Sequence, residues 1–117
     1  MKTNLVSASL DPSHAQLDAF AMARTAVSAA YSAFVRHVDD LTPATLHGGE
    51  AAQLREAADA CLFGDDDAVE RLACACELLA RLSGYGRLES AIATRLHDEV
   101  LAVDTASLRL SSVAFAA

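Results

Sequence analysis

The residue types best suited to chemistry are concentrated between Ala58 and Cys76, in the stretch ADACLFGDDDAVERLACAC. Cysteine and aspartate side chains both bind metals, and thiols also serve in redox sites. Cys74 and Cys76, however, are two positions apart, so on one helix their side chains point about 200° apart and cannot bind the same ion. The C-x-x-C pairs and Cys/His spacings of zinc sites are absent from the sequence. We therefore predict structural cysteines and no bound metal or cofactor.

The helical phase of each cysteine predicts its exposure. Cys61 and Cys76 each share a helix face with leucine, valine or alanine side chains, which is where thiols usually pack as small apolar groups. Cys74 instead shares its surroundings with Glu70 and Glu77. We expect Cys61 and Cys76 to be core residues and Cys74 to reach solvent.

The aspartate run at residues 65–67 directly precedes the sequence AVERL. Carboxylates at the start of a helix accept hydrogen bonds from free backbone N–H groups and complement the positive end of the helix dipole. Asp67 and Glu70 have the spacing of a capping box. A calcium-binding loop would need alternating acidic positions and a distal glutamate, which this run lacks. The run therefore predicts a helix start.

The four histidines form no recognisable catalytic or metal-binding pattern. His14, His37, His47 and His97 stand outside the H-E-x-x-H and Glu-x-x-His patterns of helical metal sites. His97 could act as a general base, but its neighbour Asp98 occupies an adjacent helix position, where side chains do not face each other. Phosphate-binding glycine loops and serine nucleophile motifs are also absent from the sequence. We predict that the protein is not an enzyme.

Length and composition indicate one helical domain over residues 1–117. The chain has 117 residues, of which 53% are hydrophobic and 21% charged, values typical of a folded domain. Alanine and leucine dominate the hydrophobic residues, and both are strong helix formers. The net charge of -7 disfavours direct nucleic-acid binding, because phosphate contacts require lysine and arginine. The odd number of cysteines and the lack of an apolar leader predict a cytoplasmic protein with reduced thiols. The lack of an apolar run of membrane length predicts that the protein does not enter a membrane.

The positions of proline, glycine and apolar residues predict an all-α fold, an up-and-down bundle of about four helices with a long first helix. Residues 1–10 lack a helical period and are expected to form a flexible arm. The predicted helices run from Pro12 to Leu41 after a capping Asp11, from about Glu50 to Phe63, from the aspartate run to about Ser83, and from about Arg87 past Val103. Residues 108–117 form an apolar tail, which either docks or frays.

Two rows of side chains follow the long first helix. The first row has the alternating three- and four-residue spacing of a core seam, interrupted by Arg24: Leu17, Phe20, Val27, Tyr31, Phe34, Val38 and Leu41. The second, which we call the alanine row, lies on a different side: Ala15, Ala19, Met22, Ala26, Ala30 and Ala33. Small side chains let another helix approach closely, although alanine is also simply a good helix former.

The stretch YGRLESAIATRL, from Tyr85 to Leu96, resembles the turn and second-helix start of a tetratricopeptide repeat around Gly86, Leu88 and Ala91. That resemblance would imply a groove that binds a partner's peptide. The match covers about a dozen residues, and Arg95 and Asp98 depart from the repeat's pattern. A second copy at a spacing of 34 residues is also absent, so the sequence is not assigned to that family.

These features predict a small acidic protein–protein interaction or adaptor module. We expect an unknown protein partner and a homodimer, with the interface supplied by Ala19, Met22, Ala26, Ala30 and Ala33, because a bundle with shorter helices leaves part of the long helix uncovered. One alternative is a pocket in the bundle where Arg24 receives a small anionic ligand. Another is an acidic decoy for a basic, DNA-handling partner, with a surface formed by Asp39, Asp40, Glu50, Glu56, Asp59 and Asp65 to Asp67.

Overall fold

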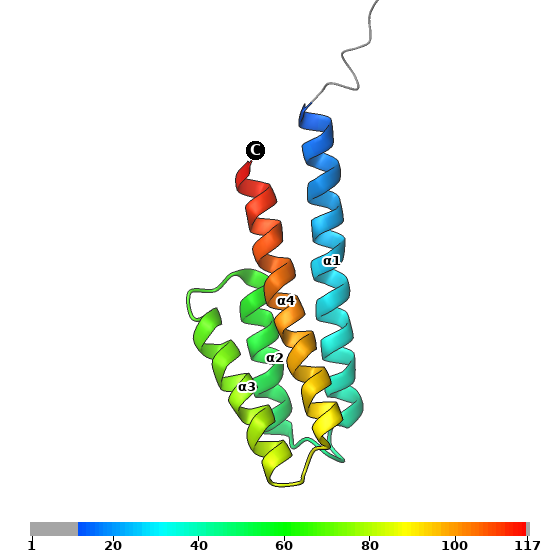
Figure 1. Cartoon of the computed structure of the whole chain (residues 1–117), viewed down its shortest axis with the longest axis vertical. Helices are drawn as coiled ribbons and strands as arrows, with labels where there is room; N and C mark the ends of the chain where they lie inside the picture. The colour runs from blue at the N-terminus through cyan, green and yellow to red at the C-terminus, as the bar shows by residue number, and fades with distance from the viewer. Residues whose placement is uncertain (1–11, 117) are drawn as a thin grey trace, which may run out of the picture.

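The computed structural model of the protein describes residues 12–116, and over this range it contains four helices and no strand. The helices are α1 (Pro12–Leu41), α2 (Gly48–Phe63), α3 (Ala68–Gly84) and α4 (Ser90–Ala116). They run alternately down and up, as Figure 1 shows, which confirms the predicted all-α bundle with a long first helix. The arm predicted at residues 1–10, the capping role of Asp11 and the last residue lie outside the described range.

The helix ends follow from local chemistry. Gly64 ends α2 in the left-handed region, with φ 66°, and its backbone N–H donates to the carbonyl of Ala60, as is common for a glycine after a helix. Helix α4 begins three residues later than expected, at Ser90 rather than Arg87. Residues 108–116, which the sequence set apart as a tail, continue α4 as a regular helix.

The core lies where all four helices run side by side. Its largest fully buried side chains come from every helix and from the α1–α2 loop: Phe34, Val38, Leu46, Leu54, Leu79, Leu96, Val100 and Val103. Helix α1 packs mainly along α4 and also against α2, but not against α3. Burial of this apolar surface is the main force that holds the helices together.

The predicted seam of α1 is buried only in its second half. Val27, Phe34 and Val38 are buried, whereas Leu17 is 67% exposed and Arg24 is exposed as well. The reason is the unequal length of the helices: α1 has 30 residues and α4 has 27, but α2 has only 16 and α3 only 17. The upper parts of α1 and α4 therefore extend together beyond the other two helices (Figure 1).

Within the described residues, no helix is both long enough and apolar enough to cross a membrane.

Candidate functional site

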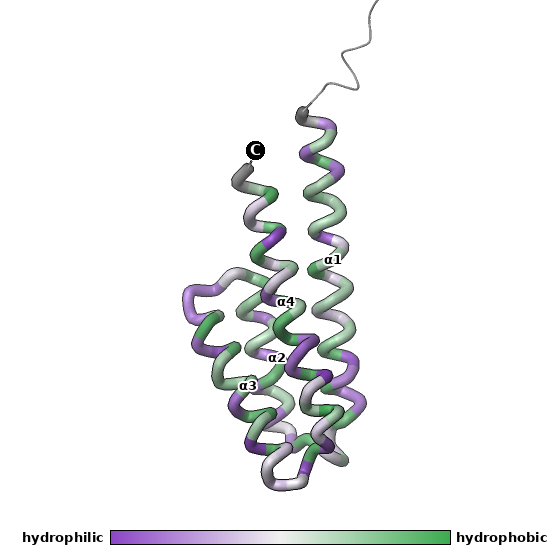
Figure 2. The backbone as a smooth tube through the Cα atoms, viewed as in Figure 1, coloured by the Kyte–Doolittle hydropathy of each residue, from purple (hydrophilic) through white to green (hydrophobic). Residues whose placement is uncertain are grey.

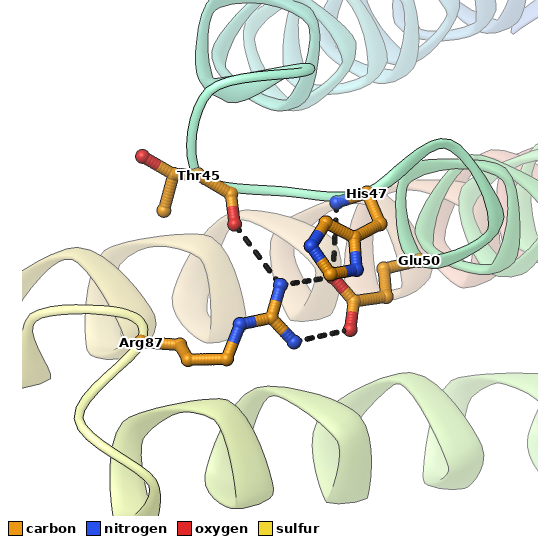
Figure 3. A network of polar contacts seen from close by, with 4 residues as sticks. All are labelled: Thr45, His47, Glu50 and Arg87. Carbon is orange, nitrogen blue, oxygen red and sulfur yellow. Dashed lines mark hydrogen bonds and ion pairs between the residues drawn. The ribbon is translucent and has the colours of Figure 1, made fainter.

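The best-defined polar network joins two loops at the lower end of the bundle (Figure 3). Arg87, in the α3–α4 loop, donates from Nη1 to Oε2 of Glu50 at 2.7 Å and from Nη2 to Oε1 at 2.9 Å. The same Nη2 lies 3.3 Å from the carbonyl oxygen of Thr45. Glu50 also accepts a hydrogen bond from the backbone N–H of His47 at 3.0 Å. A bidentate pair of this kind fixes the relative positions of the segments that carry it.

The network holds the Glu50 carboxylate in its ionised form. The hydrogen bond from Arg87, followed by that from the His47 N–H, lowers the pKa of Glu50 to about 2. Every acceptor and donor in the network is supplied by this protein, so its geometry is that of a structural clasp between the α1–α2 loop, the first turn of α2 and the α3–α4 loop.

Several carboxylates of the suggested acidic surface are engaged within the protein. Arginine side chains donate to three of them: Arg55 to Asp39 at 3.1 Å, and Arg71 to Glu56 at 3.1 Å and to Asp67 at 2.7 Å. Tyr31 donates its phenolic hydrogen to Asp59, and that bond raises the pKa of Tyr31 to about 12. These contacts reduce the negative charge that a basic partner would meet.

The predicted capping box of α3 does not form. Asp67 occupies the cap position, but its side chain makes no hydrogen bond to the helix backbone. It accepts instead from Nε of Arg71, one helical turn further on. The Asp67 backbone has φ -95° and ψ 14° rather than the extended conformation in which a cap residue usually directs its side chain to the helix N–H groups.

Cys61 is buried and Cys74 is exposed, as their helical phases indicated, whereas Cys76, which was expected in the core, is only partly buried and packs against it. Burial, with a smaller contribution from Asp104, raises the pKa of the Cys61 thiol to about 11, and burial also raises the pKa of Cys76. Both thiols are therefore held in the protonated form. Within the part of the chain that the structure describes, no three His, Cys, Asp or Glu side chains are grouped so as to hold a metal ion.

An open groove of about 450 Å³ lies between α3 and the first half of α4, and its wall includes Cys76, Ser83, Ser90 and His97. The two serine hydroxyls lie 3.2 Å apart and hydrogen-bond to each other. His97 Nδ1 lies 3.6 Å from Asp98 Oδ1, closer than adjacent helix positions suggested but longer than a hydrogen bond. A protonated thiol and an imidazole without a hydrogen-bonded acid do not constitute an activated nucleophile.

The other histidines also contact acids. His37, on α1, lies 2.7 Å from a carboxylate oxygen of Glu99 on α4 and so joins these two helices. His14 lies 3.9 Å from Asp18, and His47 lies 3.9 Å from Glu50. Each of these contacts joins side chains of this protein.

The most unusual surface is at the upper end, which we call the tip and define as residues 14–29 of α1 and 105–114 of α4. Ser107 of α4 donates to the carbonyl oxygen of Cys61, in the last turn of α2. A notch of about 220 Å³ there is lined by Arg24, Val27, Ser28, Tyr31, Leu62 and Leu110. Helix α2 thus ends level with these residues, and α1 continues for about 20 Å from Arg24 to Pro12.

One side of the tip continues the face that α1 turns toward α2. Tyr31 lies on that face, because it bonds to Asp59 of α2. Arg24 is seven residues before Tyr31, Phe20 is four before Arg24, and Leu17 is three before Phe20, so all of them lie on the same face of α1. Arg24 lies over the ring of Phe20, 5.9 Å from its centroid. We call Leu17, Phe20, Arg24, Leu110 and Ala114 the tip face. In the body, α2 covers this side of α1, whereas at the tip none of the four helices covers it.

Arg24 therefore lies at the surface rather than inside a core seam. The ion pairs that the structure places among residues 14–114 do not include it. The alanine row runs along another side of α1: Ala15, Ala19, Met22 and Ala26 are exposed, and Ala30 and Ala33 are partly buried. Met22 is 73% exposed. The upper half of α1 is coloured mostly green, between isolated purple residues, in Figure 2.

The tip also differs in charge from the rest of the molecule. It contains one carboxylate, Asp18, and two arginines, Arg24 and Arg109. Residues 30–104, which we call the body, contain fourteen carboxylates and six arginines. With neutral histidines the tip carries a formal charge of +1 and the body a charge of -8. The sequence composition gave no sign of this division, because it reports only the total.

No protein-family model, no curated protein and no solved structure shows a significant match to this chain.

Proposed function

We propose that the protein is an interaction module that docks a helical partner on its tip. The observation that carries the proposal is that α1 and α4 present the continuation of the bundle's core face where α2 has ended. Leu17, on this face, is 67% exposed. Large apolar side chains that remain in water at one end of a small domain are typical of interaction surfaces.

The shape and composition of the tip favour a partner that presents an apolar helix. Two antiparallel helices form a groove into which the side chains of a third or fourth helix can pack. The tip has few charges and many small residues, so a helix can approach its backbone closely. An amphipathic helix would bury its apolar side there and leave its polar side in water.

The anionic-ligand alternative rests on Arg24, which lines the notch without an ion pair among the described residues. Small-molecule sites usually measure about 300–1,000 Å³ and enclose most of the ligand. This notch measures about 220 Å³, and a second hollow beside Arg24, of about 530 Å³, is lined by residues of α1 alone, so we place this alternative second. Calorimetric titration with inorganic phosphate tests it. Stoichiometric binding that is lost in Arg24→Gln would favour a ligand site, and absence of heat would remove that support.

The acidic-decoy alternative is less well supported. A decoy must offer unpaired carboxylates on one surface, but Asp39, Glu56 and Asp67 are paired with arginines, and Glu50 is held by Arg87.

Position-specific photo-crosslinking in the native host tests the proposed function. A benzophenone amino acid replaces Leu17 on the tip or, as the matched control, Val69 on α3, which is also an exposed branched residue. We expect one defined adduct, identified by mass spectrometry, from position 17 and none from position 69. Absence of any adduct from position 17, or the same adducts from both positions, would contradict docking on the tip.

A further inference from the structure

We infer that the tip docks on the tip of a second copy of this chain, around a two-fold axis, so that two half-bundles complete one four-helix bundle. This inference rests on the proposed function and names the occupant of the same surface. It places the interface on the tip face rather than on the alanine row.

The first argument is geometric. Below the notch, α2 and α3 complete the bundle around α1 and α4; above it, only α1 and α4 continue. What is missing there is a pair of antiparallel helices of about the same length. A second tip is such a pair, and the two-fold relation makes each tip cover the other with the same residues.

The second argument is the distribution of charge. Two bodies of charge -8 repel each other when they lie side by side. Tip-to-tip docking places the bodies at opposite ends, beyond the Debye length of about 8 Å at physiological ionic strength. The tip carries a formal charge of only +1, so two tips repel each other far less than two bodies do. A strongly basic partner would instead be attracted to the acidic body.

The size of the surface sets the expected strength. Beyond the notch, α1 extends for about 20 Å and α4 for about 14 Å. With a width of about 10 Å per helix, the face covers roughly 350 Å² of projected area in each copy. Stable complexes bury about 800 Å² per partner. We therefore expect a reversible dimer with a dissociation constant in the range of tens to hundreds of micromolar.

Sedimentation equilibrium between about 5 and 500 µM tests the inference with two matched variants. Leu17→Glu adds a charge to the tip face, and Met22→Glu adds the same charge to the alanine row of the same helix. Both positions are exposed, at 67% and 73%, so both variants should keep the fold, which circular dichroism checks. We expect a concentration-dependent dimer for the wild type, at least tenfold weaker association for Leu17→Glu, and less than threefold change for Met22→Glu.

Two outcomes would overturn the inference. A wild type that stays monomeric over the whole range excludes the second copy as occupant, yet an adduct between position 17 and a different protein would still support the proposed function. A dimer that is lost in Met22→Glu but retained in Leu17→Glu would move the interface to the alanine row and contradict the tip face.

Discussion

The three thiols illustrate how far a single residue's properties follow from its place on a helix. Cys61 is 2% exposed and Cys74 is exposed, as their helical phases predicted, but Cys76 is only partly buried. The raised pKa of Cys61 and of Cys76 adds a second barrier to reaction, because the thiolate is the reactive form.

We expect a thiol reagent such as DTNB to modify one group rapidly in the native protein and the other two at least tenfold more slowly. The fast phase should disappear in Cys74→Ser, which is exposed and should fold normally. In denaturant all three thiols of the wild type should react at similar rates. Similar rates for all three in the native protein would show that the burial of Cys61 and Cys76 is transient.

The Glu50–Arg87 clasp should make the folded protein less stable as the pH falls. The pKa of Glu50 is lowered from 4.5 to about 2 in the folded protein, so its contribution to stability is fully present above pH 4.5 and is lost as the pH falls toward 2. At pH 3, roughly 40% of the contribution should remain. We expect the stability difference between wild type and Arg87→Met, measured by urea unfolding, to be smaller at pH 3 than at pH 6.5.

Arg109→Met is the control for this comparison, because it removes one positive charge at the opposite end of the molecule. Its stability difference from wild type should change less with pH. An Arg87→Met difference that grows as the pH falls would contradict the assigned clasp.

The clasp also shows what local sequence patterns could not reveal. Glu50 and Arg87 are 37 positions apart, and only the packing of the helices brings their loops together. At the start of α2 a contact between positions three apart does form, because the His47 N–H donates to Glu50. At the start of α3 the predicted capping box, Asp67 with Glu70, does not form, and Asp67 accepts from Arg71 instead, a pairing that the spacing does not show.

At the scale of the helices, the backbone conformation of Gly64, and not the room around it, makes a larger residue unfavourable at this position. Its φ is 66°, and an added Cβ would meet no atom within 4 Å. Gly64→Ala should therefore lower the free energy of unfolding by about 1 kcal/mol through backbone strain alone. Gly49→Ala is the control, because Gly49 lies in the first turn of α2 with equal space and an ordinary φ. It should leave stability unchanged or slightly raised.

The two halves of α1 should respond differently to truncation of large side chains. Phe34 is fully buried, so Phe34→Ala should cost about 3–5 kcal/mol. Leu17 lies on the same row but is mostly exposed, so Leu17→Ala should change stability by less than about 0.5 kcal/mol. Chemical denaturation at low micromolar concentration, where self-association is negligible, measures both. A large cost for Leu17→Ala would mean that an intramolecular contact covers it.

The helices themselves were predictable because proline, glycine and apolar spacing are local signals. Pro12 correctly predicted the first residue of α1, and Gly64 correctly predicted the end of α2. The predicted start of α4 differs from the observed one by only three residues. Whether the row from Leu17 to Leu41 is buried along its whole length is not a local property. It depends on where α2 ends relative to α1, and the periodicity of one helix does not contain that information.

At the scale of the whole molecule, the proposed function rests on the core face that α1 and α4 continue beyond α2, and the tip that carries this face has few charges whereas the body is acidic. The body contains most of the buried core and several ion pairs between its helices and loops. The tip consists of the parts of α1 and α4 that extend beyond α2 and α3. In the proposed function, the body provides the core and the tip provides the docking surface.

The arrangement of two copies can be measured with pulsed electron–electron dipolar spectroscopy at several hundred micromolar protein. One spin label is attached in a Cys74→Ser background, either through Gln16→Cys on the tip or through Glu89→Cys at the lower end. Tip-to-tip docking predicts a distance below about 30 Å between the labels at position 16. It predicts about 70 Å between those at position 89, since α1 spans about 45 Å in each copy and the two copies overlap along about 20 Å of the tip. No dipolar coupling from position 16, or a distance at position 89 as short as that at position 16, would contradict docking through the tip.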